Sequence, residues 1–487
     1  MRLAKECKVA IIEKTYDGGV CLPERSANMS LRGKLVVFWM KHRPRHIATT
    51  QMVALMFAAI ILLGALLLTL PAASRDGVSC GLRPALFTAT SATCVTGLVL
   101  YDTWSQWSGF GQVVILCLIQ IGGLGFMSVA TLLIFLLRRK IGLQQRLMIA
   151  QSLSVNDIKG VVRLQKLVLI GSFSVEAVGA IILTLRFWSE YGFTRALRWG
   201  VFHSVSAFCN AGFDIFGSIA PGQSLIEFNA DPVVLLTLSA LIIIGGLGFL
   251  VWENIVQKRS FGKFSVYARM VLLMTAALLA VGWAGTCLLE WNNPETLGGM
   301  TVGEKLLNGF FQSATLRTAG FAAIDQAKLT ESGKAFSCVL MSIGGSSGST
   351  AGGIKTVTFL VLALTIWARA RGKSTVCAFK RTIPDEQTQN AMIIAFIVLA
   401  LAVFGGIFIS ATSPMSFTDA VYEAVSALAT VGLSAGGTAS LSIPAQILII
   451  IYMYFGRVGV LTISLGFLAG DRAEERFRYA ETNLLIG

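Results

Sequence analysis

The chain has 487 residues, of which 54% are hydrophobic and only 14% charged, and its mean hydropathy is +0.71. A soluble globular protein carries about a quarter of its residues as charges, so this composition excludes an ordinary soluble domain and predicts a membrane protein. The 40 lysines and arginines exceed the 26 acidic residues and give a net charge of +14, but they gather in connections between apolar runs. We therefore expect contact with membrane lipid and no nucleic-acid partner.

Several apolar stretches are as long as the roughly 20 residues that a bilayer helix needs. They include residues 47–70, 113–137, 233–251, 271–289 and 447–468. A basic group precedes the first stretch and places the N-terminus in the cytoplasm by the positive-inside rule: Lys34, Lys41, Arg43 and Arg45. Later basic clusters at 138–166, 258–269 and 369–381 alternate with connections that carry acidic residues. This alternation predicts a multi-pass chain with basic cytoplasmic loops.

A short motif recurs four times, at intervals of slightly more than a hundred residues. Its copies are "SATCVTGL" (91–98), "SAFCNAGF" (206–213), "SATLRTAGF" (313–321) and "SALATVGL" (426–433). Each copy lies between two apolar segments, which predicts four copies of one structural unit. The predicted organisation is an N-terminal tail at 1–45, then repeats at 46–140, 141–260, 261–375 and 376–487.

The segment before each motif is too short to cross a bilayer and is therefore expected to re-enter. "TVGE" (301–304) and "SFTD" (416–419) fit the pattern that begins a helix. Four such helices would direct the negative ends of their dipoles at one axis. The carbonyl groups that follow could then replace the water shell of a cation. No carboxylate occurs in the four turns, which favours a monovalent ion.

A second glycine motif follows each turn. It reads "IGGLGF" at 121–126 and again at 244–249, "IGGSSG" at 343–348 and "FGRVG" at 455–459. Two interpretations stay open at this stage. These glycines either pack helices closely or form one layer below the four turns.

The third copy continues into "GGSSGSTAGGIKT" (344–356), which is similar to a phosphate-binding loop. That loop requires a lysine directly after its second glycine, whereas Ile354 separates Gly353 from Lys355. The segment also follows an apolar span rather than a strand. We therefore predict no nucleotide on this chain. We also predict no enzyme activity and no catalytic residues, because no HExxH or CxxC pattern occurs.

The four motifs together resemble the Trk/Ktr/HKT superfamily of potassium transporters, and most closely the KtrB type, the membrane subunit of bacterial Ktr systems. The resemblance covers nearly all of the chain from about residue 45. It implies an all-α polytopic membrane protein with four covalently linked M1–pore helix–M2 repeats, arranged pseudo-fourfold around one central pore. It also implies a bacterial plasma membrane location.

Site residues follow from the resemblance. The backbone carbonyls of the implied potassium-binding selectivity filter belong to Val95, Thr96, Gly97, Asn210, Ala211, Gly212, Thr318, Ala319, Gly320, Thr430, Val431 and Gly432. The implied gate within 344–353 comprises Gly345, Ser346, Ser347, Gly348, Ser349, Thr350, Ala351 and Gly352, together with Arg457 in the last span. A lone arginine in a span is costly and usually functional. The alternative is that helix-end carbonyls hold Arg457 for structural reasons.

The resemblance implies potassium uptake, passive or as sodium-stimulated symport, with sodium as a further candidate ion. The expected partners are a second copy in a homodimer and a cytosolic ring of RCK-type, KtrA-like regulatory subunits that bind ATP or ADP. Two alternatives remain. One is a potassium channel subunit of the TrkH type, and the other is an inverted-repeat sodium/solute symporter.

Overall fold

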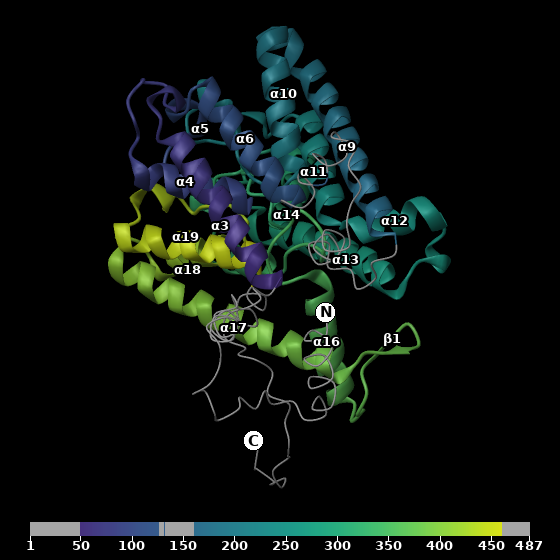
Figure 1. The fold of residues 1–487 in the computed structure, drawn as a ribbon. Coiled ribbons are helices and arrows are strands. Elements are labelled where there is room, and N and C mark those ends of the chain that lie inside the picture. The colour runs from purple at the N-terminus through teal and green to yellow at the C-terminus, as the bar shows by residue number, and fades with distance from the viewer. Residues whose placement is uncertain (1–48, 126–130, 132–159, 460–487) are drawn as a thin grey trace, which may run out of the picture. The chain divides into compact units, whose positions relative to one another are not determined.

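The computed structural model describes residues 49–125, 131 and 160–459. The chain divides into two units, 1–47 and 48–487, and the coloured ribbon of Figure 1 belongs to the second. The predicted tail at 1–45, part of the basic connection at 138–166, and the distal parts of the predicted spans 113–137 and 447–468 lie outside the described residues.

The first repeat contains four described helices. They are α3 (Thr49–Leu68), α4 (Leu82–Cys94), the single turn α5 (Thr103–Gln106) and α6 (Gly109–Leu124). Helix α6 begins at Ser108, whose hydroxyl oxygen accepts a hydrogen bond from Gly111 N at 3.3 Å. It ends at Gly125, whose φ of 81° continues no right-handed helix.

The second repeat contains a bend within one predicted span. Its helices are α9 (Val161–Tyr191), α10 (Phe193–Phe208), α11 (Pro232–Gly246) and α12 (Phe249–Lys258). We predicted a span at 233–251, and the structure divides it into α11 and α12, which meet at an angle of 93°. The break falls at Gly248, whose φ is 91°, because glycine adopts this conformation without the penalty that a Cβ brings.

The third repeat contains an interrupted helix, and a small hairpin follows it at the start of the fourth repeat. Its helices are α13 (Val266–Glu290), α14 (Val302–Thr315), α15 (Glu331–Ser342) and α16 (Thr356–Ala370). Residues 343–355, which contain the predicted gating segment, are not helical. Strands β1 (Cys377–Ala378) and β2 (Arg381–Thr382) then pair antiparallel.

The fourth repeat has α17 (Asp385–Thr412), α18 (Phe417–Leu428) and α19 (Ile443–Val458). Helix α18 begins as predicted from "SFTD", since the Ser416 hydroxyl oxygen accepts from Asp419 N at 3.2 Å. Short 3₁₀ turns complete the described elements of the chain: η1 (Pro71–Ala73), η2 (Phe216–Ser218), η3 (Ile226–Phe228), η4 (Phe261–Lys263), η5 (Gln326–Lys328) and η6 (Thr438–Ser440).

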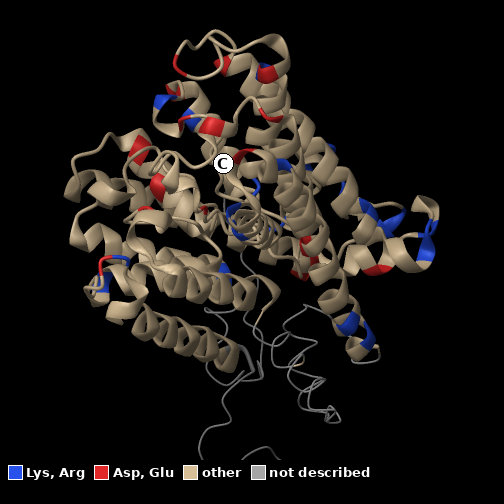
Figure 2. Cartoon of the chain, turned by 90° about the horizontal axis from the view of Figure 1, so that it is seen from above, with Lys and Arg blue, Asp and Glu red and all other residues tan. Residues whose placement is uncertain are grey.

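The first helix of every repeat is long and apolar enough to span a bilayer. Within the described residues these are α3, α9, α13 and α17, and the bent pair α11–α12 makes a fifth candidate. Their outward faces carry exposed apolar side chains such as Leu288, 81% exposed, and Phe396, 74% exposed. Figure 2 shows charged residues mainly near helix ends and in connections, with long uncharged helices between them. The chain is therefore an integral membrane protein.

The repeats close into a ring. We call α4, α10, α14 and α18 the pore helices; each packs against the first long helix of its own repeat. The helix that follows the pore helix then packs against the next repeat's pore helix: α6 on α10, α11 on α14, α15 on α18, and α19 on α4. The last of these contacts joins repeat 4 to repeat 1. The predicted fold class, four linked repeats in a pseudo-fourfold arrangement, is confirmed.

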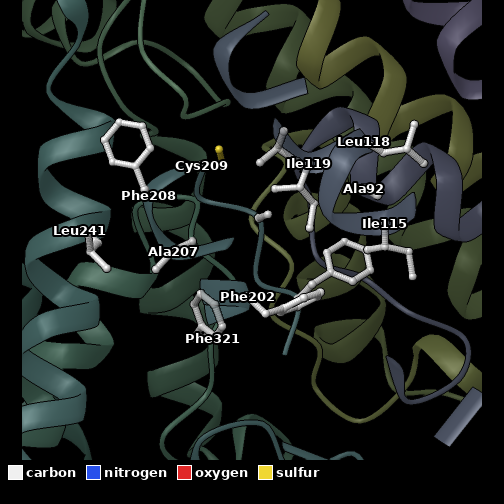
Figure 3. Packing of buried hydrophobic residues seen from close by; sticks show 14 of the residues in the cluster. Ala92, Ile115, Leu118, Ile119, Phe202, Ala207, Phe208, Cys209, Leu241 and Phe321 are labelled. Carbon is white, nitrogen blue, oxygen red and sulfur yellow. The ribbon is translucent and has the colours of Figure 1, made fainter. Parts of the chain in front are cut away.

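Buried side chains gather where the repeats meet. The largest described cluster joins repeats 1 and 2, a second joins repeats 1 and 4, and a third joins repeats 3 and 4. Figure 3 shows part of the first, which includes Ile115, Leu118 and Ile119 of α6 together with Phe208 and Cys209 at the end of α10. Packing at these interfaces holds the ends of the pore helices in place.

The start of pore helix α14 offers a test of its local stability. The Thr301 hydroxyl oxygen accepts from Glu304 N at 3.4 Å, and the Glu304 carboxylate accepts from Thr301 N at 2.8 Å. Thr301→Ala removes the hydroxyl that caps the helix and is expected to cost about 1 kcal/mol of unfolding free energy. Thermal unfolding in detergent measures the loss, with Thr301→Ser as the control that keeps the hydroxyl. Equal melting temperatures for both variants would contradict the assignment.

Candidate functional site

The four glycine turns share one backbone conformation. In each turn a non-glycine residue has left-handed φ: 57° at Val95, 57° at Asn210, 70° at Thr318 and 51° at Thr430. The filter glycine two residues later is again positive, at 100° for Gly97, 68° for Gly212, 83° for Gly320 and 97° for Gly432. The residue between them has no positive φ. A backbone that alternates in hand turns successive carbonyl groups to one side, and four such turns repeat this geometry.

The four turns touch in cyclic order. A Cβ on Gly97 would lie 2.6 Å from the carbonyl oxygen of Ala211 in repeat 2. A Cβ on Gly212 would lie 2.8 Å from that of Ala319, and one on Gly320 would lie 2.5 Å from that of Val431. A Cβ on Gly432 would collide with the Thr96 carbonyl oxygen, which returns the circle to repeat 1. The structure thus brings all twelve predicted filter residues into one closed ring of backbone.

Hydroxyl groups at the ends of the pore helices hold the ring. Ser91 and Ser426 accept hydrogen bonds from Gly97 N and Gly432 N, each at 3.1 Å. In the other two repeats the hydroxyl donates instead, from Ser206 to Phe213 O and from Thr315 to Phe321 O, each at 2.7 Å. We aligned Ser313 with the other motif serines, but Thr315 takes that place and Ser313 donates to Leu279 O.

The ring has the chemistry of a site for a dehydrated monovalent cation. All four pore helices end at the ring, so their negative dipole ends meet there. The hydroxyls of Thr93, Thr96 and Thr430 are buried and have no hydrogen-bond partner among the described residues. In residues 49–125, 131 and 160–459 no three His, Cys, Asp or Glu side chains are grouped to hold a metal ion. Oxygen atoms of backbone and hydroxyls are therefore the available ligands.

The predicted gating segment is a loop whose two ends are joined. Gly344 N donates to Ile354 O at 2.9 Å, and Ile354 N donates to Ser342 O at 3.1 Å. Ile343 and Ile354 thereby form a parallel bridge. Residues 345–352 form a loop that begins and ends at this bridge.

The loop contacts the ring and the second repeat. The Thr350 hydroxyl donates to Phe208 O at the end of α10 at 3.1 Å, and Gly352 N donates to the Thr318 hydroxyl at 3.3 Å. Backbone bonds from Ser346 N to Gly246 O and from Phe249 N to Gly348 O dock the loop on the α11–α12 break. The loop therefore contacts the end of the second repeat's pore helix and the turn of the third repeat directly.

Arg457 joins the loop to the first repeat. One guanidinium nitrogen donates to Thr350 O at 2.5 Å, and the other donates to Gly122 O at 2.5 Å and Gly123 O at 3.1 Å. The helix-end carbonyls of α6 do hold this arginine, as the structural interpretation expects. The bond to Thr350 also places it on the loop, so the two interpretations are compatible.

The second glycine motif combines close packing with a helix break. A Cβ on Gly122, Gly245 or Gly456 would collide with a carbonyl oxygen at the end of the same repeat's pore helix. The last glycine of each motif has positive φ: 81° at Gly125, 91° at Gly248, 65° at Gly348 and 94° at Gly459. Both interpretations of "IGGLGF" therefore apply, at different positions of one motif.

Two contacts in this region bear on earlier predictions. The loop follows helix α15 rather than a strand, and Lys355 Nζ donates to Ala351 O at 2.8 Å within the loop. This geometry differs from that of a nucleotide-binding loop. Tyr267 of α13 donates its hydroxyl to Ser347 O at 2.9 Å, a contact that no motif or spacing in the sequence indicates.

Comparison with known proteins identifies the family. Residues 27–475 match the TrkH family, described as a cation transport protein. The chain belongs to the TrkH family. The resemblance to this family of potassium transporters, which we drew from the four motifs, is therefore confirmed.

Relatives of this TrkH-family chain cover most of its length. It is 38% identical over 454 residues to the potassium/sodium uptake protein NtpJ of Enterococcus hirae, spanning 92% of this chain and 99% of the relative. It is 37% identical to the Ktr system potassium uptake protein B of Bacillus subtilis, spanning 92% and 98%. The potassium transporter TrkH from Vibrio parahaemolyticus shares the fold, with a TM-score of 0.68 at 18% identity over 88% of this chain and 86% of that one.

A carboxyl group beside the ring predicts a dependence on pH. Burial and, to a smaller extent, the nearby Asp102 raise the pKa of Asp214, two residues after Gly212, to about 7. The raised pKa means that folding favours the neutral form, so this contribution to stability is present below about pH 4 and is lost as pH rises through 7. Asp214→Asn does not titrate. Its melting temperature should therefore gain on the wild type between pH 5 and pH 8. A difference between Asp214→Asn and the wild type that stays constant over this pH range would contradict the assignment.

Proposed function

We propose that this protein takes up potassium across the bacterial plasma membrane through the ring of glycine turns. The closed, four-repeat contact of glycines with neighbouring carbonyl oxygens carries the proposal. Carbonyl rings replace the hydration shell of a monovalent cation, and the similar proteins of Enterococcus hirae and Bacillus subtilis are named for potassium uptake. The twelve residues of the ring then act as the selectivity filter.

Glycine in all four turns supports selectivity for potassium. A side chain at any of these positions would intrude on a carbonyl oxygen of the adjacent repeat. Because the ion is held by backbone oxygen atoms, a displaced carbonyl alters the fit for ions of different size. The name of the Enterococcus protein also includes sodium, which supports sodium stimulation as part of the proposal.

The loop at 344–353, with Arg457, is proposed as the gate. It contacts pore helix α10 and Thr318 and is joined through Arg457 to α6, so opening a path requires these contacts to break. The arginine also puts a positive charge close to the proposed ion path, where it opposes the passage of cations.

Partners complete the proposal. We place the N-terminus in the cytoplasm, and we propose a homodimer regulated by a cytosolic ring of KtrA-like RCK subunits that bind ATP or ADP. The name of the Bacillus relative refers to a Ktr system, which supports a multi-component assembly. The basic connection at 258–269 offers a surface of suitable charge for such a partner.

Gly432→Ser tests the filter. The serine Cβ would collide with the Thr96 carbonyl oxygen and would have to adopt a φ of 97°, so the ring must distort. We expect the potassium-to-sodium flux ratio in liposomes to fall about tenfold, equivalent to about 1.4 kcal/mol. Gly299→Ser is the control, because a Cβ there meets nothing within 4 Å.

Wild-type protein must first restore potassium uptake to a transport-deficient bacterium, with the regulatory partner present. Absence of potassium flux in that strain and in liposomes would refute the proposed function. A Gly432→Ser variant with an unchanged flux ratio would refute only the filter assignment.

Deletion of residues 345–352 tests the gate. The ends of this segment are already hydrogen-bonded to each other, so excision leaves the rest of repeat 3 in place. We expect potassium flux to rise and the flux ratio to stay the same, because the deletion removes none of the twelve ring residues whose carbonyl groups line the proposed filter. Unchanged or lower flux with normal folding would show that the loop is not the gate.

Two substitutions of Arg457 separate its charge from its hydrogen bonds. Arg457→Gln removes the charge. Arg457→Lys keeps the charge but has a single nitrogen atom, whereas two nitrogen atoms of the arginine now bond the carbonyl groups of Thr350 on one side and of Gly122 and Gly123 on the other. If the tether closes the gate, both variants raise flux; if the charge does, only Arg457→Gln raises it.

A further inference from the structure

Behind the ring, three repeats tie the pore helix to the segment that follows the filter. In repeat 4 the buried Glu423 of α18 accepts hydrogen bonds from the hydroxyls of Ser434 and Thr438. The bond from Thr438 is 2.9 Å long. Ser434 in turn accepts from Gly437 N at 3.2 Å. One carboxylate therefore fixes the chain as it leaves Gly432.

Repeat 2 makes the same link with different chemistry. His203 of α10 lies nine residues before Gly212, as Glu423 lies nine before Gly432. Its Nε2 accepts from Ile215 N at 3.2 Å, so the proton sits on Nδ1, which bonds Trp199 O at 2.7 Å. The imidazole is fully buried and stacks on Phe216, with ring centroids 3.9 Å apart.

Repeat 3 uses a pair of amides. Gln312 of α14, eight residues before Gly320, donates to Gln326 at 2.7 Å and accepts from it at 3.2 Å. Gln326 also accepts from the hydroxyl of Tyr422 in α18 at 3.0 Å. This pair therefore connects the third post-filter segment with the fourth pore helix as well as its own.

We propose that Glu423, His203 and the Gln312–Gln326 pair are positioning residues that hold the outer ends of three filter turns and so set ion selectivity. The proposal rests on the proposed potassium filter. The filter carbonyls are backbone atoms, and their spacing depends on the contacts between adjacent turns and on what anchors the chain on either side. Ser91, Ser206, Thr315 and Ser426 anchor the turns from the pore-helix ends, and this second layer anchors the segments beyond them.

Repeat 1 lacks, among the described residues, the link that the other three repeats make between the pore helix and the segment after the filter. The residue nine before Gly97 is Thr88, and the described residues show no comparable link from it. Instead Asp102, beyond the filter, accepts from Gly222 N of repeat 2 at 3.2 Å. The first turn is thus held from the neighbouring repeat, and the three links named above are independent of it.

Glu423→Leu tests the proposal. It removes both hydrogen bonds at similar volume, and we expect the potassium-to-sodium flux ratio in liposomes to fall about tenfold. Glu423→Gln should keep a ratio close to the wild type, since the Ser434 and Thr438 hydroxyls can each donate or accept. Such a rescue is not expected if the negative charge itself matters.

Glu290 provides a matched control away from the ring. It is 1% exposed and also accepts from two threonine hydroxyls, Thr296 at 2.9 Å and Thr330 at 2.7 Å. Glu290→Leu should lower the melting temperature without changing the flux ratio. If Glu423→Leu likewise changes only the melting temperature, the proposal is overturned.

Two milder variants apply if Glu423→Leu does not fold. Ser434→Ala and Thr438→Val each remove one donor to the carboxylate, and each should lower the flux ratio by a smaller factor. Wild-type flux ratios in both would overturn the proposal. A wild type that carries no potassium would refute the proposed function instead, so the two failures are distinguishable.

Discussion

The four glycine turns meet backbone to backbone, and each glycine lies against a carbonyl oxygen of the next repeat with no room for a side chain. This contact fixes much of the surrounding structure. The pore helices have to stop at one level, and their ends need hydroxyls that bond the departing backbone. The helices that follow have to approach the pore-helix ends closely, which glycines at positions 122, 245 and 456 permit.

The third repeat departs furthest from this symmetry. Its turn begins three residues after α14 ends, compared with one residue after α4 in repeat 1 and two residues after α10 and α18 in repeats 2 and 4. Its following helix stops at Ser342 and gives way to the loop, whose Gly352 lies against Thr430 and Ala429 O of the fourth repeat. Arg457, in the last turn of α19, reaches that loop through its hydrogen bond to Thr350 O.

Much of this could be predicted from the sequence, because it is carried by repetition. Four turns at regular spacing predicted the four repeats, and the four motifs alone located the glycine turns that the structure brings together in one ring. Span lengths were less predictable: hydropathy reads 233–251 as one apolar run, but it does not register the positive φ of Gly248 that bends the run by 93°. The contacts of Tyr267 and of Arg457 with the loop depend on tertiary packing between distant segments, which no local pattern records.

The buried layer behind the ring shows what a single chain can do that identical subunits cannot. A carboxylate, an imidazole and an amide pair occupy corresponding places in three repeats, because each repeat can change without the other three. The backbone that they support has the same alternating conformation in each turn. The side chains behind it can therefore differ as long as each satisfies its own hydrogen bonds. Glu423 and His203 lie nine residues before the glycine of their turn and Gln312 lies eight residues before it, so comparison between repeats finds nearly the same position although the residue type differs.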